Sequence, residues 1–290
     1  MNEINDSVYL FCYFKGHGDG LHLAWSRDGF HWHALNGDLP YITGQTGPEK
    51  LMRDPFVLAA PDGMFHLVWT AGWRGNGIGY ASSPDLLNWS SQKFLEVMAH
   101  ESETRNCWAP EILYDDTQDQ YIIYWASSIP GRYPETDDLG DEGLNHRMYC
   151  TMTKDFKRFA ETRLFFDAGF NVIDATVVKD NNRYLLFFKD ETSRPLQKNI
   201  RVAVADGIFD GFKNVSKPLT GAYWAEGPSA VKINGRWVVY FDKYKLNRMG
   251  AVTSADLKHW QDISDQLYFP EGAQHGAVQK IDFNRISHLF

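Results

Sequence analysis

The sequence predicts an all-β chain that folds as a single five-bladed β-propeller over residues 1–290. Strand-like alternation recurs along the chain, as in 65–69 and 236–240, whereas long apolar stripes of helical period are almost absent. One unit recurs four times at a spacing of roughly 50 to 65 residues, which is typical of a four-stranded blade. The two ends of the chain supply complementary strands for a fifth blade.

Each repeat contains a short strand, a turn, a hydrophobic strand, a loop, a third strand and a corner of the form S-x-D-x-x-x-W. The four copies begin with RDPFVLAAPDGMFHLVWTA, WAPEILYDDTQDQYIIYWAS, IDATVVKDNNRYLLFFKDE and AEGPSAVKINGRWVVYFDKY. Trp32, Trp89 and Trp260 close such corners, and we interpret them as packing residues. A β-sandwich is the alternative fold, but it would not explain a repeated inner-strand signature.

Both ends of the chain are predicted to close the ring. Near the N-terminus, VYLFCYF, LHLAWSRD and FHWHAL supply strands without a preceding inner strand. Near the C-terminus, QHGAVQKI supplies an inner strand without followers. Joining them completes a fifth blade and removes exposed sheet edges.

Composition excludes several classes of function. The net charge is −8 and no basic run occurs, which argues against a nucleic-acid surface. Three cysteines without C-x-x-C spacing indicate buried thiols, not a disulfide framework or zinc site.

No apolar stretch approaches the ~20 residues of a membrane span. We expect a soluble protein with no protein partner. MNEINDSVYL lacks the build of a signal peptide, and an exported mature form leaves the compartment open.

The inner strands of a propeller line its central channel and run in the same direction. Aligning the repeats places five residues at one register, namely Asp54, Ala109, Asp174, Glu226 and His275. Three carboxylates and a histidine are thus expected to converge at one mouth of the channel. A single acidic residue at a strand start is usually a turn former or cap, but three in one ring indicate function, because clustered like charges destabilise a fold.

The order of the blades suggests different roles for the three carboxylates. Asp174 and Glu226 are on neighbouring blades, whereas Asp54 is two blades from each. The diagonal of a regular pentagon is roughly 1.6 times its side, so Asp54 should lie farther away. A close carboxyl pair favours one protonated member, a general acid, while Asp54 stays ionised as a base. Inverting glycosidases hold such an acid and base about 6.5–9.5 Å apart.

The triplets RDP, WAPE, IDA and EGP at successive inner strands resemble glycoside hydrolase family 43 along essentially the whole chain. That family comprises five-bladed propellers that act as arabinofuranosidases, xylosidases, arabinanases and some galactosidases. The resemblance implies that Asp54 is the general base, Asp174 the pKa modulator and orienter, and Glu226 the general acid. IDA replaces the commoner IDP, and an extra group of strands precedes Asp54; both departures bear on the subfamily and the substrate.

Other residues near the ring are candidates for binding sugar. Trp108 and Trp224 lie just before ring positions, and Trp73 lies in a glycine-rich loop, so each could stack on a sugar face or pack between blades. Arg248 and Arg132, both in loops, could contact sugar hydroxyls or remain solvated.

The resemblance also bears on His275 and on cofactors. It implies an ion such as calcium on the propeller axis, contacted by a histidine and waters; no cofactor is required. Calcium prefers oxygen ligands, so the alternative for His275 is hydrogen bonding to the acid pair. The insert SSIPGRYPETDDLGDEGLNHRMY is predicted to be a loop that could close one side of the site and favour exo-cleavage.

The leading prediction is an inverting exo-glycosidase whose substrate is a plant-type poly- or oligosaccharide. It would remove a terminal pentose, with α-L-arabinofuranose ahead of β-D-xylose. A β-galactosidase of the same family and a non-catalytic carbohydrate-binding propeller are the alternatives. Fructan-cleaving propellers are disfavoured because no NDPNG motif occurs, and sialidases because no arginine triad can be placed.

Overall fold

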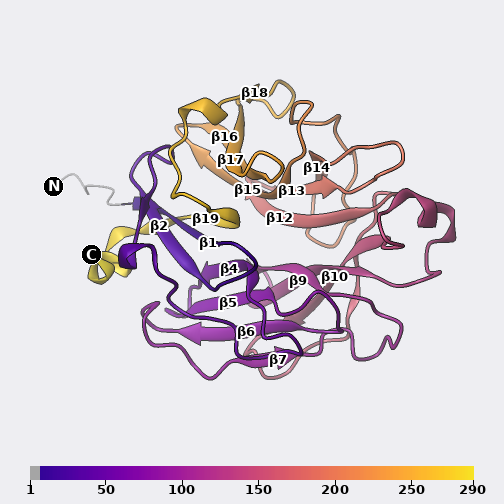
Figure 1. The fold of residues 1–290 in the computed structure, drawn as a ribbon, viewed down its shortest axis with the longest axis horizontal. Coiled ribbons are helices and arrows are strands. Elements are labelled where there is room, and N and C mark those ends of the chain that lie inside the picture. The colour runs from indigo at the N-terminus through magenta and orange to yellow at the C-terminus, as the bar shows by residue number, and fades with distance from the viewer. Residues whose placement is uncertain (1–6) are drawn as a thin grey trace.

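The computed structural model describes residues 7–290, and these residues form five antiparallel sheets arranged around a central axis (Figure 1). Helical structure in them is limited to short 3-10 segments, namely Asn36–Asp38, Pro134–Leu139, Ser264–Gln266, Phe283–Arg285 and Ser287–Leu289. The predicted all-β five-bladed propeller is therefore confirmed.

Each sheet corresponds to one blade, and its strands follow one another from the axis outward. The first repeat folds into β4 (Arg53–Ala59), β5 (Phe65–Thr70), β6 (Ile78–Ser83) and β7 (Lys93–Leu95). The second folds into β8 (Trp108–Asp115), β9 (Gln120–Ser128), β10 (His146–Thr153) and β11 (Arg163–Phe166). The third has three strands, β12 (Val172–Asp180), β13 (Arg183–Asp190) and β14 (Asn199–Ala205). The fourth folds into β15 (Glu226–Ile233), β16 (Arg236–Lys243), β17 (Arg248–Ser254) and β18 (Gln261–Asp262).

The fifth blade combines the two ends of the described chain, as predicted. Its strands are, from the axis outward, β19 (Gln274–Asp282), β1 (Ser7–Phe14), β2 (His22–Ser26) and β3 (His33–Ala34). Antiparallel pairing runs from Ser7 opposite Asp282 to Phe14 opposite Gln274. Figure 1 shows yellow β19 beside indigo β1. The inner strands β4, β8, β12, β15 and β19 each contact the next one around the ring, which is thereby closed.

The core lies between the blades, where large side chains from facing sheets pack together. Trp69, Trp125, Phe187 and Tyr240 come from the second strands of four blades and are all fully buried. Each apolar cluster contains residues of at least two neighbouring blades. This packing fixes the inner strands relative to one another and therefore positions the residues at the channel mouth.

The S-x-D-x-x-x-W corners are structural, as predicted. In one of them, Asp85 accepts hydrogen bonds from the backbone N–H groups of Leu87 and Asn88, and Trp89 donates to the carbonyl of Leu86. The corner that ends in Trp260 is built in the same way. Trp32 is 5% exposed and packs on Phe11 and Phe269. An aspartate that satisfies the turn's own donors explains why this signature recurs.

Two further sequence observations can be compared with the described residues. Cys12, Cys107 and Cys150 are buried free thiols, in agreement with the prediction. Among residues 7–290, no helix has the length and apolar character needed to cross a membrane.

Candidate active site

The inner strands share a β-bulge at the same point, close to one mouth of the channel. In four of them the bulge contains a residue with left-handed backbone: Asp54 (φ 49°), Ala109 (φ 46°), Asp174 (φ 52°) and Gly227 (φ 58°). This conformation is unfavourable for most L-residues, and such strain persists where the surrounding structure enforces it, commonly at functional sites. The repeated bulge therefore aims one residue of each strand at a common place.

The predicted register is wrong by one residue for Glu226. Pairing with the second strand places Glu226 opposite Asp242, just as Arg53 is opposite Thr70. Gly227, not Glu226, is therefore the counterpart of Asp54. The repeats were matched by their carboxylates, whereas glycine occupies the left-handed position in the motif EGP. Glu226 thus enters the site from the preceding position of its strand.

Asp54 is an ionised carboxylate held by two partners. Its Oδ1 lies 3.2 Å from Nδ1 of His275, and its Oδ2 accepts a hydrogen bond of 2.7 Å from the hydroxyl of Thr70. Burial raises the pKa of Asp54, but the charge of His275 and hydrogen bonds outweigh this effect and lower it to about 2. Burial likewise lowers the pKa of His275, but the charges of Asp54 and Asp174 raise it to about 10. The two groups form an ion pair at neutral pH.

Asp174 is a buried ring carboxyl that holds its proton more firmly than Asp54 does. It is 6% exposed, and its Oδ2 accepts a hydrogen bond of 3.2 Å from the backbone N–H of Gly227. Burial raises its pKa to about 6, opposed by the positive charges of His275 and Lys189. The charge of Glu226 raises this pKa more than that of Asp54 does. This order is consistent with the neighbouring blades predicted for Asp174 and Glu226.

Glu226 lies against a buried lysine that the sequence analysis missed. Lys189 is 2% exposed, and its Nζ donates a hydrogen bond of 2.9 Å to Oε2 of Glu226. Lys189 lies near the end of β13, opposite Ile173, in the same register as Thr70 and Asp242 on their blades. A signal was present, because a polar residue ends each of the apolar runs LVWT, LLFFK and VVYFD.

These second-strand residues form an outer ring that supports the first. Thr70 accepts from the backbone N–H of Ala109 on the next blade, Lys189 reaches Glu226 on the next blade, and Asp242 accepts from the backbone N–H of His275. Burial raises the pKa of Asp242 to about 7, aided by the charge of Glu226. The site is therefore a layered set of polar groups, in which three second strands each hold the next inner strand.

The axis itself offers little room for an ion. A cavity of about 10 Å³, with room for about one water molecule, is lined by Asp54, Glu111, Asp174 and His275. Burial raises the pKa of Glu111 to about 8, and Tyr124 donates a hydrogen bond to it. Among residues 7–290, no group of three or more His, Cys, Asp or Glu side chains is arranged to hold a metal. We derive no step through a metal, and the calcium ion that the resemblance implies stays a prediction.

Two of the predicted tryptophans meet beside the ring. Trp73 and Trp108 are perpendicular with centroids 6.0 Å apart, and Nε1 of Trp108 donates to the carbonyl of Trp73. They line a pocket of about 370 Å³ whose other walls include Glu191 and Asp141. Asp141 belongs to the predicted loop insert between β9 and β10. The insert thus forms one wall of a cavity next to the predicted site.

The other two predicted binding residues lie elsewhere around the mouth. Trp224 is half-buried, 5.8 Å from the ring of Tyr244 and under the Nζ of Lys245 at 5.0 Å. Arg248 is half-exposed and pairs with Asp265 on the outer part of its blade, and within residues 7–290 it forms no hydrogen bond or ion pair with the ring carboxyl groups. Arg132 similarly pairs with Glu101.

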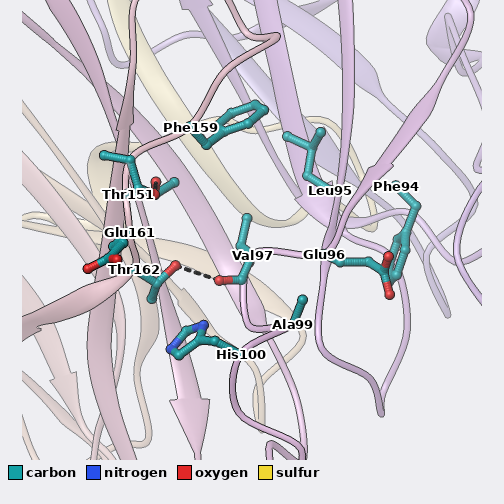
Figure 2. Close-up of a pocket in the computed structure, with 11 residues that line it drawn as sticks. Phe94, Leu95, Glu96, Val97, Ala99, His100, Thr151, Phe159, Glu161 and Thr162 are labelled. Atoms are coloured by element: carbon teal, nitrogen blue, oxygen red, sulfur yellow. Dashed lines mark hydrogen bonds between the residues drawn. The ribbon is translucent and has the colours of Figure 1, made fainter.

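A larger cavity of about 620 Å³ lies away from this site. It is formed between β7 and the β10–β11 region of the next blade and is lined mainly by apolar side chains such as Phe94, Val97 and Phe159 (Figure 2). It contains none of the ring carboxylates. Volume alone would therefore select a different place, whereas the polar groups that could act on a substrate converge at the channel mouth.

Comparison with known proteins places the chain in a family. A family described as "Probable glycosyl hydrolase domain", related to glycoside hydrolase family 43, matches residues 6–285. An α-L-arabinofuranosidase of Bifidobacterium longum is 26% identical over 211 residues, which are 64% of this chain and 20% of that protein. The chain thus spans about a fifth of that relative's length.

Solved structures share the fold. An α-L-arabinofuranosidase from Lactobacillus brevis superposes with a TM-score of 0.58 at 22% identity, covering 79% of this chain and 74% of that one. A GH43_1 enzyme from Xanthomonas citri complexed with xylose gives 0.57 at 13% identity, covering 77% and 75%. The chain belongs to the glycosyl hydrolase domains related to glycoside hydrolase family 43.

Proposed function

We propose that this protein is an inverting, exo-acting glycoside hydrolase that removes a terminal pentose. The observation that carries the proposal is the convergence of Asp54, Asp174 and Glu226 at one channel mouth, next to a pocket walled by Trp73 and Trp108. Tryptophan faces suit the C–H surface of a sugar ring, and carboxyl groups on both sides of a glycosidic bond suit its hydrolysis.

The proposed chemistry divides the work among the three carboxyl groups. Asp54, ionised and held by His275 and Thr70, takes a proton from the attacking water. Glu226 gives its proton to the departing glycosidic oxygen, and Asp174 orients the sugar and Glu226 through its fixed, buried carboxyl group. The C–O bond breaks as water adds from the opposite face, so the anomeric configuration inverts.

The loop insert supports exo-action. Asp141, Glu142 and Leu144 of the insert line the pocket with the two tryptophans, so one end of the binding groove is walled. A walled groove accepts a chain end more readily than the middle of a polymer. We place α-L-arabinofuranose ahead of β-D-xylose as the terminal sugar, with β-galactose as the alternative; one relative is named an α-L-arabinofuranosidase.

A panel of 4-nitrophenyl glycosides tests the proposal. α-L-Arabinofuranoside, β-D-xyloside and β-D-galactoside are incubated with the wild-type protein and with Asp54→Asn. We expect nitrophenol release from a pentoside and at least hundredfold slower release by the variant. Binding of arabino- or xylo-oligosaccharides without turnover of any substrate would instead identify a carbohydrate-binding propeller.

A further inference from the structure

A row of acidic and basic side chains in contact runs from Glu226 to the loop insert. Lys189 contacts Oε2 of Glu226 at 2.9 Å and Oε2 of Glu191 at 2.7 Å. Glu191 in turn contacts Lys198 through its other oxygen, and Lys198 reaches Oδ2 of Asp141 at 2.8 Å. The order is therefore carboxyl group, ammonium, carboxylate, ammonium, carboxylate, starting from Glu226.

Lys189 and Lys198 are both buried, with 2% and 1% of their side chains exposed. A buried ammonium group is costly unless it is paired and hydrogen-bonded, so ordinary stability does not explain two of them. The buried ion pairs hold Lys189 charged: although burial lowers its pKa, the charges of Glu226 and Glu191 raise it well above its usual value. A fixed positive charge therefore stays next to Glu226 over the whole working pH range.

We propose that Lys189 is a positioning residue for the general acid Glu226, and that Glu191 and Lys198 hold Lys189 in place. This inference rests on the proposed function. Lys189 fixes Oε2 of Glu226, and no protein group within residues 7–290 hydrogen-bonds Oε1, which is left to face the leaving group.

The charge of Lys189 also has a role during the reaction. When Glu226 passes its proton to the glycosidic oxygen, the bond to the anomeric carbon breaks and its electron pair goes to that oxygen. Glu226 is then left as a carboxylate. A preorganised ammonium group 2.9 Å away stabilises the negative charge as it forms. Lys189 thereby makes proton donation easier, most of all for a leaving group that needs the proton.

Removing the charge of Lys189 changes the electrostatic environment of the ionisable groups that surround Glu226. These groups come from four strands and the segments that follow two of them, namely Asp174 on β12, Lys189 on β13, Glu191 after β13, Asp242 on β16, Tyr244 after β16 and His275 on β19. Lys189 lowers the pKa of both Asp174 and Asp242, so its loss leaves the carboxyl cluster more firmly protonated. The alkaline limb of the pH profile, which reports loss of the acid's proton, should therefore move to higher pH.

The test compares Lys189→Met with Lys243→Met. Lys243 is a 4% exposed lysine one register position farther along the next blade, but it pairs with Asp262 away from the ring. For each protein, kcat/KM is measured across pH with two aryl glycosides of the sugar that the wild type hydrolyses. One carries 2,4-dinitrophenol, which leaves without a proton, and the other carries phenol, which needs one.

We expect Lys189→Met to lower kcat/KM about 100-fold for the phenyl glycoside but less than about fivefold for the dinitrophenyl glycoside. Its alkaline limb should move up by about one pH unit. Lys189→Arg should keep the alkaline limb at its wild-type pH. Glu191→Gln should lower kcat/KM for the phenyl glycoside and move the alkaline limb to higher pH, both by less than Lys189→Met does. Lys243→Met should change neither.

Two outcomes would overturn the inference, and they are distinguishable. A wild-type protein that hydrolyses no glycoside refutes the proposed function and this inference with it. An active wild type whose Lys189→Met variant loses activity equally on both leaving groups, with an unmoved alkaline limb, shows that Lys189 is only structural. Should Lys189→Met not fold, Lys189→Arg and Glu191→Gln decide by the same two readouts.

Discussion

Nδ1 of His275 lies 3.2 Å from Oδ1 of Asp54, and the hydroxyl of Thr70 donates to the other oxygen of that carboxylate. This arrangement joins the last inner strand to the first and so spans the seam where the ring closes. It keeps Asp54 ionised and its orientation fixed. The fold therefore supplies a carboxylate that is ionised and oriented to accept a proton, although its basicity is low.

The Asp54→Asn variant should separate catalysis from folding. Asparagine tolerates the left-handed backbone at this position and can still accept the hydrogen bond from Thr70. We expect kcat to fall by a factor of roughly 10² to 10⁴, because the base is lost. Circular dichroism should show an unchanged β-rich spectrum. Activity within tenfold of the wild type would contradict the assignment of Asp54 as the base.

The Asp174→Asn variant tests a ring carboxyl group that titrates within the usual assay range. The pKa of Asp174 is raised to about 6, chiefly by burial. If ionisation of this group affects turnover, the wild-type rate should change near pH 6, and the variant should lack that change. Rates measured from pH 4 to 8 check this prediction. An identical profile in both proteins would show that Asp174 does not control the rate by its charge.

Substitution of the paired tryptophans should weaken substrate binding. Trp73 is 45% exposed and, with Trp108, lines the pocket beside the ring. An aromatic contact of this kind contributes about 0.5–1.5 kcal/mol, so Trp73→Ala should raise KM about two- to tenfold with a smaller effect on kcat. Trp89→Ala, at a structural corner, serves as the control and should lower thermal stability instead.

Stability should fall as pH rises from mildly acidic to alkaline values. His275 has a folded pKa of about 10 against an ordinary value of 6.5, so its contribution is complete below pH 6.5 and is lost as pH rises through 10. Asp242 and Glu111 have pKa values raised to about 7 and 8, so the folded state also binds more protons than the unfolded state between pH 4 and 8. The unfolding temperature should therefore decrease between pH 5 and pH 9.

His275→Gln is the matching variant for this pH dependence. It removes the titrating group but keeps a donor near Asp54. The decrease in unfolding temperature between pH 7 and 9 should then be smaller than in the wild type. Differential scanning calorimetry at both pH values makes the comparison, and an equal decrease in both proteins would assign the effect to the buried carboxyl groups alone.

Much of this fold could be predicted from the sequence because the same inner-strand motif and the same aspartate corner recur in successive blades. The motif at each inner strand and the aspartate corners depend on local turns, so the blades and the closure by both chain ends were predictable. The register of Glu226 was not, because whether a carboxylate or the following glycine occupies a bulge depends on pairing with the second strand. The role of Lys189 was missed for a related reason: the run LLFFK shows a polar residue at that position, but not its contact with Glu226 on the next blade.

The stereochemistry of hydrolysis tests the central claim most directly. The pentoside that the wild type cleaves is followed by ¹H NMR during the first minutes, before the released sugar mutarotates. The account predicts that the first product has the anomeric configuration opposite to that of the substrate. A first product with retained configuration would contradict the assignment of Asp54 as a base acting through water.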